Sequence, residues 1–380
     1  MTDSHAQTKP ILDRRVDAFK TGLQDLGFSY WVDDNQYVMT TLQEGASAEL
    51  GEYNSPSRVA LVNFKNKTIK SIANDAGIWG FDRRKGTFII AHTHLTEPNG
   101  PNGGIKILYS NMREVRIEPN GDVIEVKRFE PGAEPPASYL KPPEDENYPR
   151  GVSYESLNDG WDGFLINYLE PGDTYRKQFE RIDKTGEGYP TMWIRPGQPP
   201  LPLSVRYDEI FSPVYLKYLD KFLLNNGDTS MSSSTNSNIA VRPWNRHYEY
   251  TPFRLLARDG TVEDIPYPDF IFDCGIASRK WQNGVGRNFS IFLPTRAGIL
   301  ISKDRENGSS LYLFQNNQLY QIAGGKMLLG VNLAHLSAER ISLNQLSPGG
   351  CKFAYSHLGT DRSYRAPKFL TILDLCKAAQ

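Results

Sequence analysis

The sequence lacks long apolar runs and has no excess of charge of either sign. Its 380 residues include 43 basic and 44 acidic side chains, which gives a formal charge of −1. No basic domain or stripe supplies the attraction to phosphates on which nucleic-acid binding depends, so we expect no nucleic-acid partner. No stretch approaches the roughly 18 apolar residues of a membrane-spanning helix, so we also expect no membrane span.

The first residues are polar as well. The segment Met1–Pro10 lacks the apolar core of a secretory signal peptide. Two interpretations stay open. Either the protein is cytosolic, or a signal peptide or lipid anchor preceded this start and has been removed.

Cysteine is scarce, with three residues in the chain. No four ligands have the spacing of a structural metal site, and neither Gly-x-Ser-x-Gly nor a complete dinucleotide fingerprint occurs. We therefore expect neither a metal nor a cofactor. Paired carboxylates for glycoside hydrolysis stay open, because the sequence does not fix the separations of its 44 acidic side chains.

The abundant residues are those of strands and turns. Aromatic residues make up 12% of the chain, with 20 Tyr and 18 Phe, and there are 32 Gly and 25 Pro. Aromatic and β-branched side chains favour strands, and Gly and Pro favour the turns between them. The composition predicts an all-β protein.

From residue 28 onward, strand-like runs alternate with turn clusters in six units of roughly 50 residues. Five units have about four strands each, and the last has three. Four-stranded sheets repeated around an axis make a β-propeller, so we predict one propeller domain over residues 28–380. Five or seven blades, or a pair of β-sandwiches, are the alternatives. The six predicted blades are residues 28–75, 77–129, 151–197, 201–268, 270–324 and 326–376.

Residues 1–27, before the propeller, contain two further predicted elements. Apolar residues at helical spacing predict a short helix over Asp13–Leu26. These residues are Val16, Phe19, Leu23 and Leu26. The extended segment Thr8–Leu12 is expected to supply the strand that the last blade lacks, and so to close the ring.

The most informative motif begins at Ser347-Pro348-Gly349-Gly350 and continues Cys-Lys-Phe-Ala-Tyr. It resembles the Ser-Pro-Asp-Gly-x-x-apolar-Ala-Phe/Tyr signature of propeller blades in the Tol-system translocation protein, prolyl oligopeptidases and WD-repeat relatives. In that superfamily the motif forms the turn between the innermost and second strands. Gly349 stands where the signature has Asp, which removes a side-chain hydrogen bond but keeps the turn permissive. The resemblance implies a fold and no particular activity.

The last hairpin brings two cysteines together. If Ala354 lies opposite Leu373, then Cys351 lies opposite Cys376. Opposed Cβ atoms are about 4.5–5.5 Å apart, near disulfide range. We predict a disulfide, with two buried free thiols as the alternative, and we expect Cys274 to be buried and unreactive. A bridge implies an oxidising compartment, the periplasm or the cell exterior.

Two aromatic and polar segments are candidate binding sites. Trp161 and Asp162 could bind calcium or a sugar ring; a plain turn leading into a buried Trp is the alternative. Trp244, Arg246 and His247 combine a ring, a cation and a titratable group, as recognition hot spots do. An ordinary aromatic loop is the alternative there.

His92 and His94 are two residues apart and would face the same side of a strand. Two imidazoles at this spacing could hold a metal or act as a base. No third ligand is identifiable, and surface or core histidines are the alternative.

Two functions are consistent with these features. The first is a non-enzymatic, extracytoplasmic propeller that binds a protein partner through its loops; in bacteria, neutralising a secreted toxin as an immunity-type protein is one such role. The second is a propeller enzyme, a glycosidase, lyase or lactonase, with its site at the mouth of the central channel. Clustering of His92, Asp162, Arg246 and His247 at that mouth would favour the enzyme. The missing catalytic motifs and the predicted disulfide favour the first.

Overall fold

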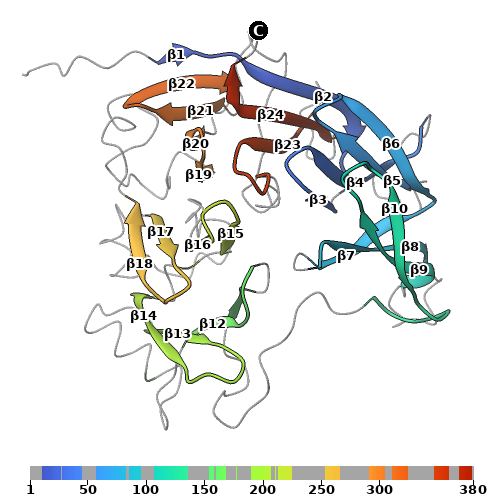
Figure 1. Cartoon of the computed structure of the whole chain (residues 1–380), viewed down its shortest axis with the longest axis horizontal. Coiled ribbons are helices and arrows are strands. Elements are labelled where there is room, and N and C mark those ends of the chain that lie inside the picture. The colour runs from blue at the N-terminus through green and yellow to red at the C-terminus, as the bar shows by residue number, and fades with distance from the viewer. Residues whose placement is uncertain are drawn as a thin grey trace, which may run out of the picture.

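Six separate β-sheets are arranged around a ring, so the protein is an all-β, six-bladed propeller (Figure 1). In this computed structural model, the residues described are 11–26, 28–44, 57–82, 85–95, 107–135, 154–157, 160–167, 177, 190–206, 210, 213–224, 253–265, 291–303, 310–323, 346–358 and 368–378. No helix in these ranges is long and apolar enough to cross a membrane.

The first three blades each have four antiparallel strands in chain order. Blade 1 consists of β3 (Ser29–Trp31), β4 (Gln36–Leu42), β5 (Ser57–Asn63) and β6 (Thr68–Asn74). Blade 2 consists of β7 (Gly77–Asp82), β8 (Thr87–Leu95), β9 (Ile107–Ile117) and β10 (Val123–Arg128). Blade 3 consists of β11 (Tyr154–Ser156), β12 (Phe164–Asn167), β13 (Pro190–Ile194) and β14 (Leu201–Arg206).

The last three blades continue around the ring, and two of them include strands from the N-terminal segment. Blade 4 consists of β15 (Val214–Leu216), β16 (Lys221–Leu223), β17 (Phe253–Leu256) and β18 (Val262–Ile265). Blade 5 consists of β19 (Ile291–Thr295), β20 (Gly298–Lys303), β21 (Ser310–Gln315), β22 (Gln318–Ala323) and β1 (Leu12–Asp13). Blade 6 consists of β23 (Lys352–Leu358), β24 (Lys368–Ala378) and β2 (Val16–Gln24).

Tight turns and buried inner strands explain why the sequence folds this way. Asn316 and Asn317 both have positive φ, 51° and 57°, which suits the two-residue turn joining β21 to β22. All seven residues of β4 are buried. Tyr37 packs in a cluster shared with blade 6, whereas its neighbour Val38 packs in a cluster shared with blade 2. A strand held between two blades is therefore buried along its whole length, and buried and exposed residues do not alternate along it.

The N-terminal segment closes the ring, as predicted, but by a different strand. Leu12 and Asp13 of β1 pair in parallel with β22 of blade 5. The antiparallel partner of β24 is β2, which becomes the outer strand of blade 6. Thr8–Pro10, the start of the predicted closing strand, lie outside the described residues.

The predicted helix over Asp13–Leu26 is wrong, because most of these residues form β2. Val16 packs in the cluster of blades 4, 5 and 6, whereas Phe19 and Leu23 contact the cluster between blades 6 and 1. The strand thus presents apolar side chains on both of its faces. Because apolar residues lie on both faces of the strand, their spacing in the sequence resembles that of one apolar face of a helix.

Two predicted blade limits also change. The fourth strand of blade 3 is β14, which lies beyond the predicted unit 151–197. Its Pro202 is tolerated because an outer strand has a free edge. The division into a closing segment, residues 1–27, and one domain, residues 28–380, stays a proposal.

Candidate functional site

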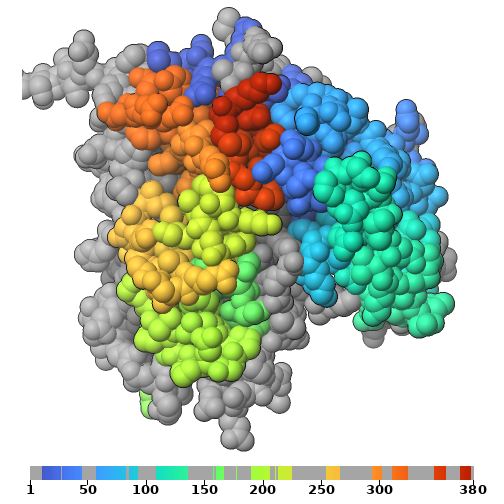
Figure 2. All heavy atoms as spheres, viewed as in Figure 1, coloured from blue at the N-terminus to red at the C-terminus, as the bar shows by residue number. Residues whose placement is uncertain are grey.

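Turns of all the blades meet on one side of the ring. In an antiparallel blade, the turn between the first and second strands lies at the same end as the turn between the third and fourth. We call the surface made by these turns the turn face. In Figure 2 the yellow-green atoms of β15 and β16 border the red atoms of β23 and β24, and buried residues of blades 4, 5 and 6 pack in one core cluster.

Trp161 is the centre of an aromatic cluster on the turn face. It lies in the β11–β12 turn, is 4% exposed, and stacks on Trp193 with ring centroids 5.2 Å apart. It also meets Phe222 of blade 4 edge to face, at 4.9 Å. Such contacts add to the stability gained by burying the rings, so Trp161 joins blade 3 to blade 4.

Asp220, in the β15–β16 turn, is the polar end of this cluster. Its Oδ1 accepts hydrogen bonds from Trp161 Nε1 (3.0 Å) and from the Tyr215 hydroxyl (2.8 Å). Arg258, in the β17–β18 turn, donates to it from Nε and Nη2, both at 3.0 Å. Hydrogen bonds from Arg258 and then Trp161 hold the pKa of Asp220 well below its usual range. Burial, with the bond to Asp220, raises the pKa of Tyr215 to about 12.

Stability is expected to fall at both extremes of pH because of this cluster. The ionised Asp220 contributes fully to folding stability above the ordinary Asp pKa of about 3.9. This contribution is lost as pH falls toward the depressed pKa that Asp220 has in the folded protein. Tyr215 contributes fully below about pH 10, and its contribution is lost as pH rises toward 12. Because Asp220 is half exposed, we expect Asp220→Asn to lower the free energy of unfolding, measured in urea, by about 1 kcal/mol at pH 7 and by less at pH 3. An equal cost at both pH values would exclude the ionised carboxylate as the cause.

A second cluster joins blades 4, 5 and 6. Arg296, in the β19–β20 turn, lies over the ring of Tyr218, with Cζ 5.9 Å from its centroid. The backbone N–H of Arg296 donates to the carbonyl of Gly350 (3.0 Å). Gly350 has φ +77°, and a Cβ there would lie 2.7 Å from the Tyr218 ring. Only glycine fits this close approach without displacement.

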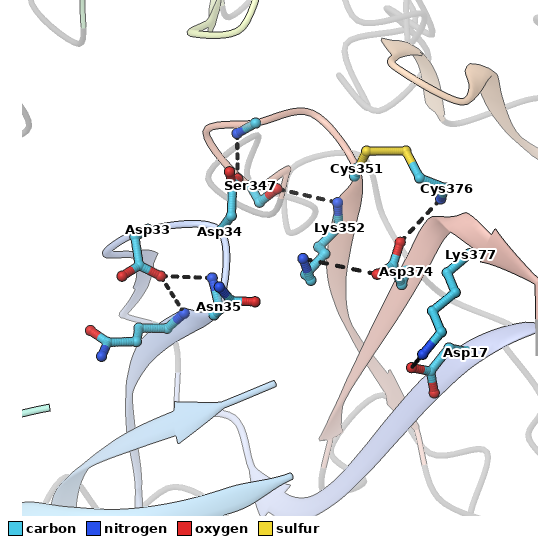
Figure 3. Close-up of polar contacts among 12 residues, drawn as sticks. Asp17, Asp33, Asp34, Asn35, Ser347, Cys351, Lys352, Asp374, Cys376 and Lys377 are labelled. Atoms are coloured by element: carbon cyan, nitrogen blue, oxygen red, sulfur yellow. Dashed lines mark hydrogen bonds and ion pairs between the residues drawn. A yellow bond between two sulfur atoms is a disulfide. The ribbon is translucent and has the colours of Figure 1, made fainter. Parts of the chain in front are cut away.

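The motif around Ser347 forms the expected turn into β23. Its Oγ accepts from the Lys352 N–H (3.2 Å), and its carbonyl accepts from the Gly350 N–H (2.8 Å). The carboxylate missing at position 349 is supplied by Asp34 of blade 1, which accepts a hydrogen bond from the Gly349 N–H (Figure 3). The inner turns of the first and last blades are thereby joined.

Gly349→Asp, which restores the residue of the family signature, is expected to destabilise the protein by about 2 kcal/mol. A Cβ at Gly349 would collide with the Asp34 carboxylate, and the two carboxylates would repel each other. Asp34→Ala alone is expected to cost about 1 kcal/mol. In the Asp34→Ala background, Gly349→Asp should cost little, because the new carboxylate can bind its own turn. Additive costs in this double-mutant cycle, measured by urea unfolding, would contradict the pairing.

The predicted disulfide is present, with the Cα atoms of Cys351 and Cys376 5.3 Å apart (Figure 3). The register on which it was predicted is wrong by one residue, because Ala354 lies opposite Ile372. A bulge explains why the bridge still forms. Three extra residues of β24, 375–377, lie between its pairings with Val16 and Asp17 of β2. At such a bulge a side chain is redirected, and Cys376 reaches Cys351.

The predicted binding residues are only partly covered by the described structure. Trp161 is buried in the turn, as the alternative interpretation held, while Asp162 beside it is exposed and its carbonyl accepts from Trp193 Nε1 (3.3 Å). Trp244, Arg246 and His247 lie outside the described residues.

His92 lies on the second strand of blade 2, five residues beyond the start of β8 and away from the turn face. Its Nε2 is 3.4 Å from Asn111 Nδ2, and Asn111 in turn accepts a hydrogen bond from Arg128 (2.8 Å). Asp162 lies in the β11–β12 turn of blade 3, so the two residues are on different blades. Among the described residues, no group of three His, Cys, Asp or Glu side chains could hold a metal ion.

The sequence interpretation missed three arginines that the structure describes on the turn face. Each lies over an aromatic ring. The pairs are Arg195 over Trp193 (4.7 Å), Arg258 over Trp161 (5.5 Å) and Arg296 over Tyr218 (5.9 Å). A signal was available, because each arginine begins an Arg-x-Gly triplet whose glycine has positive φ. A fourth triplet begins at Arg84, outside the described residues.

Comparison with known proteins supports no family assignment. No family model and no curated protein matches the chain. Pyrococcus horikoshii acylaminoacyl peptidase has a similar fold, with 12% identity and a TM-score of 0.36 over 90% of this chain and 50% of the peptidase. The chain thus spans about half the length of that enzyme.

Two other solved structures match most of both chains. The β-propeller domain of the Trilobed protease from Pyrococcus furiosus is 11% identical, with a TM-score of 0.36, and the match covers 91% of this chain and 96% of that one. A putative oxidoreductase (glucose dehydrogenase) from Thermus thermophilus is 9% identical, with a TM-score of 0.28, over 94% and 99%. At these identities the likeness concerns the fold and does not extend to activity.

Proposed function

We propose that this propeller is a non-enzymatic protein that binds a protein partner through its turn face. The observation that carries the proposal is the set of three arginines, each lying over a tryptophan or tyrosine ring, on surfaces connected from blade 3 to blade 6. Arginine and aromatic residues dominate binding energy at protein interfaces. Asp162 is exposed on the same face and is part of the proposed surface. Trp161 is buried, and its contacts with Arg258 and Asp220 hold these two residues in place.

An extracytoplasmic location, in a bacterial periplasm or outside the cell, is part of the proposal. The Cys351–Cys376 bridge supports it, because disulfides persist in oxidising compartments. Neutralising a secreted toxin, as an immunity-type protein, is the particular role we propose. Residues Trp244, Arg246 and His247 belong to the same proposal as further binding residues.

The test is capture of partners from the native envelope with tagged protein, followed by mass spectrometry. The wild type is compared with Arg195→Ala/Arg258→Ala/Arg296→Ala and with Lys127→Ala on β10 of blade 2. A partner held by the wild type and Lys127→Ala, and lost by the triple variant, is the expected result. Equal recovery with all three proteins would place the binding surface elsewhere. Recovery of no specific partner would overturn the proposal.

The second candidate is a propeller enzyme, a glycosidase, lyase or lactonase, and the solved structures named above are also of enzymes or of a protease domain. The observation that favours it in this chain is His92, a titratable side chain held beside Asn111, which Arg128 orients. A screen of glycosides, lactones and uronic-acid polymers tests it. Turnover that is lost in His92→Ala and kept in Lys127→Ala would establish the enzyme.

A further inference from the structure

We propose that the partner of the turn face is an acidic segment of a protein, and this rests on the proposed function. The turn face has cations without acidic partners, whereas several of its carboxylates already accept hydrogen bonds from the protein itself. A surface whose cations lack acidic partners fits a partner that supplies carboxylates.

In the turns of blades 3, 4 and 5 on this face, three cations have no acidic partner among the described residues. Arg195 lies over Trp193, and its Nε is buried without a hydrogen-bond acceptor. Arg296 is exposed and lies over Tyr218. Lys217, next to Tyr218 in the β15–β16 turn, is exposed as well. The remaining arginine, Arg258, is already paired with Asp220.

Four carboxylates of this face accept hydrogen bonds from the protein itself. Asp220 accepts four hydrogen bonds from three side chains. Asp34 accepts the Gly349 N–H, and Asp33 accepts the N–H groups of Asn35 and Gln36. Asp259 accepts the Thr261 N–H.

The chemistry of these cations selects carboxylates. Arg296 is exposed, and the N–H groups of a guanidinium match a carboxylate in two parallel hydrogen bonds. The ring fixes the side chain beforehand, so less conformational entropy is lost on binding. The chain as a whole has a formal charge of −1 and no basic stripe, which favours a local acidic protein segment over a nucleic acid.

The experiment uses peptides as probes. A fluorescein-labelled peptide of ten alternating Asp and Glu residues is titrated with protein, and anisotropy is followed at about 0.05 M and about 0.3 M salt. The neutral Asn/Gln peptide, a ten-nucleotide single strand and vesicles with one-third anionic phospholipid are the comparison ligands. The test variant is Arg195→Gln/Lys217→Gln/Arg296→Gln. Its matched control, Arg113→Gln/Lys127→Gln/Arg128→Gln, removes three charges from β9 and β10 of blade 2, at the end of this hairpin away from the turn face.

The acidic peptide is expected to bind the wild type and the control variant roughly tenfold more tightly than the test variant. Its binding should weaken with salt, and the neutral peptide should not bind. Equal loss in test and control variants would overturn the inference, because bulk charge would then explain binding. Equal or tighter binding of the nucleic acid or the vesicles would also overturn it. Unchanged thermal midpoints show that the variants remain folded.

Failure of this inference can be told apart from failure of the proposed function. One outcome is a captured partner that the Arg195/Arg258/Arg296 variant loses, but whose binding changes neither with salt nor in the Gln triple variant. That outcome contradicts an acidic partner and leaves the turn face as the binding surface. Absence of any captured partner contradicts both.

Discussion

A chain without residues 1–24 is expected to lose cooperative folding and to aggregate. The deletion removes β2 and exposes the edge of β24, and a free sheet edge is a template for pairing with other chains. It also removes Val16 and Leu23, each 8% exposed. Burial of each contributes about 1.5–3 kcal/mol, so the total loss is on the order of 5 kcal/mol, comparable with the whole stability of many proteins.

The measurement is the urea unfolding transition, with light scattering as the readout for aggregation. Deletion of residues 1–10 alone is the matched control, since it leaves both β1 and β2 in the chain. Leu23→Ala is the milder variant, with an expected cost of about 2–3 kcal/mol. A deletion variant that unfolds at the wild-type urea concentration would show that β2 does not close the ring.

Replacing both cysteines of the bridge, Cys351→Ser/Cys376→Ser, is expected to cost about 3 kcal/mol. The bridge joins residues 25 positions apart, and closing a loop of that length restricts the unfolded chain by about this amount. Urea unfolding measures the cost, and the wild type in reducing agent should unfold at the same concentration as the variant. Cys274→Ser is the matched control and should keep the wild-type response to reducing agent.

Alkylation followed by mass measurement tests the bridge directly. One reactive thiol, Cys274, is expected in the denatured, non-reduced protein, and three are expected after reduction. Alkylation of Cys351 and Cys376 without reduction would contradict the bridge and would remove the support for an extracytoplasmic location.

The sequence predicted the fold well where local chemistry decides the structure. The Gly- and Asn-rich clusters between strands form turns as their residue types favour; for example, Asn316 and Asn317 both have positive φ in the turn between β21 and β22. The helix over Asp13–Leu26 was wrong because the partner of this segment, β24, is distant in the chain. The contacts of its two faces with two different cores are not visible in local spacing.

The candidate site was predicted less completely, for a related reason. Trp161 was recognised as a notable residue, but its hydrogen-bond partner Asp220 is 59 positions away in the next blade. Nothing next to Asp220 in the sequence marks it as an acceptor for Trp161. Likewise, the loss of Asp at position 349 looked like a weakened turn, whereas Asp34 supplies the carboxylate from the opposite end of the chain.

The pairing of β2 with β24 also sets an order of events during synthesis. Asp17 is paired with Asp374, roughly 360 residues later, and closing so long a loop is entropically costly and slow. During synthesis, β2 therefore has no partner strand while blades 1 to 5 are translated and form their local hairpins. If the chain is exported in unfolded form, this delay keeps the ring open until the last strand has crossed the membrane. Cys376 lies in β24, so the disulfide with Cys351 would form late. It would then hold the ring closed after export across the membrane.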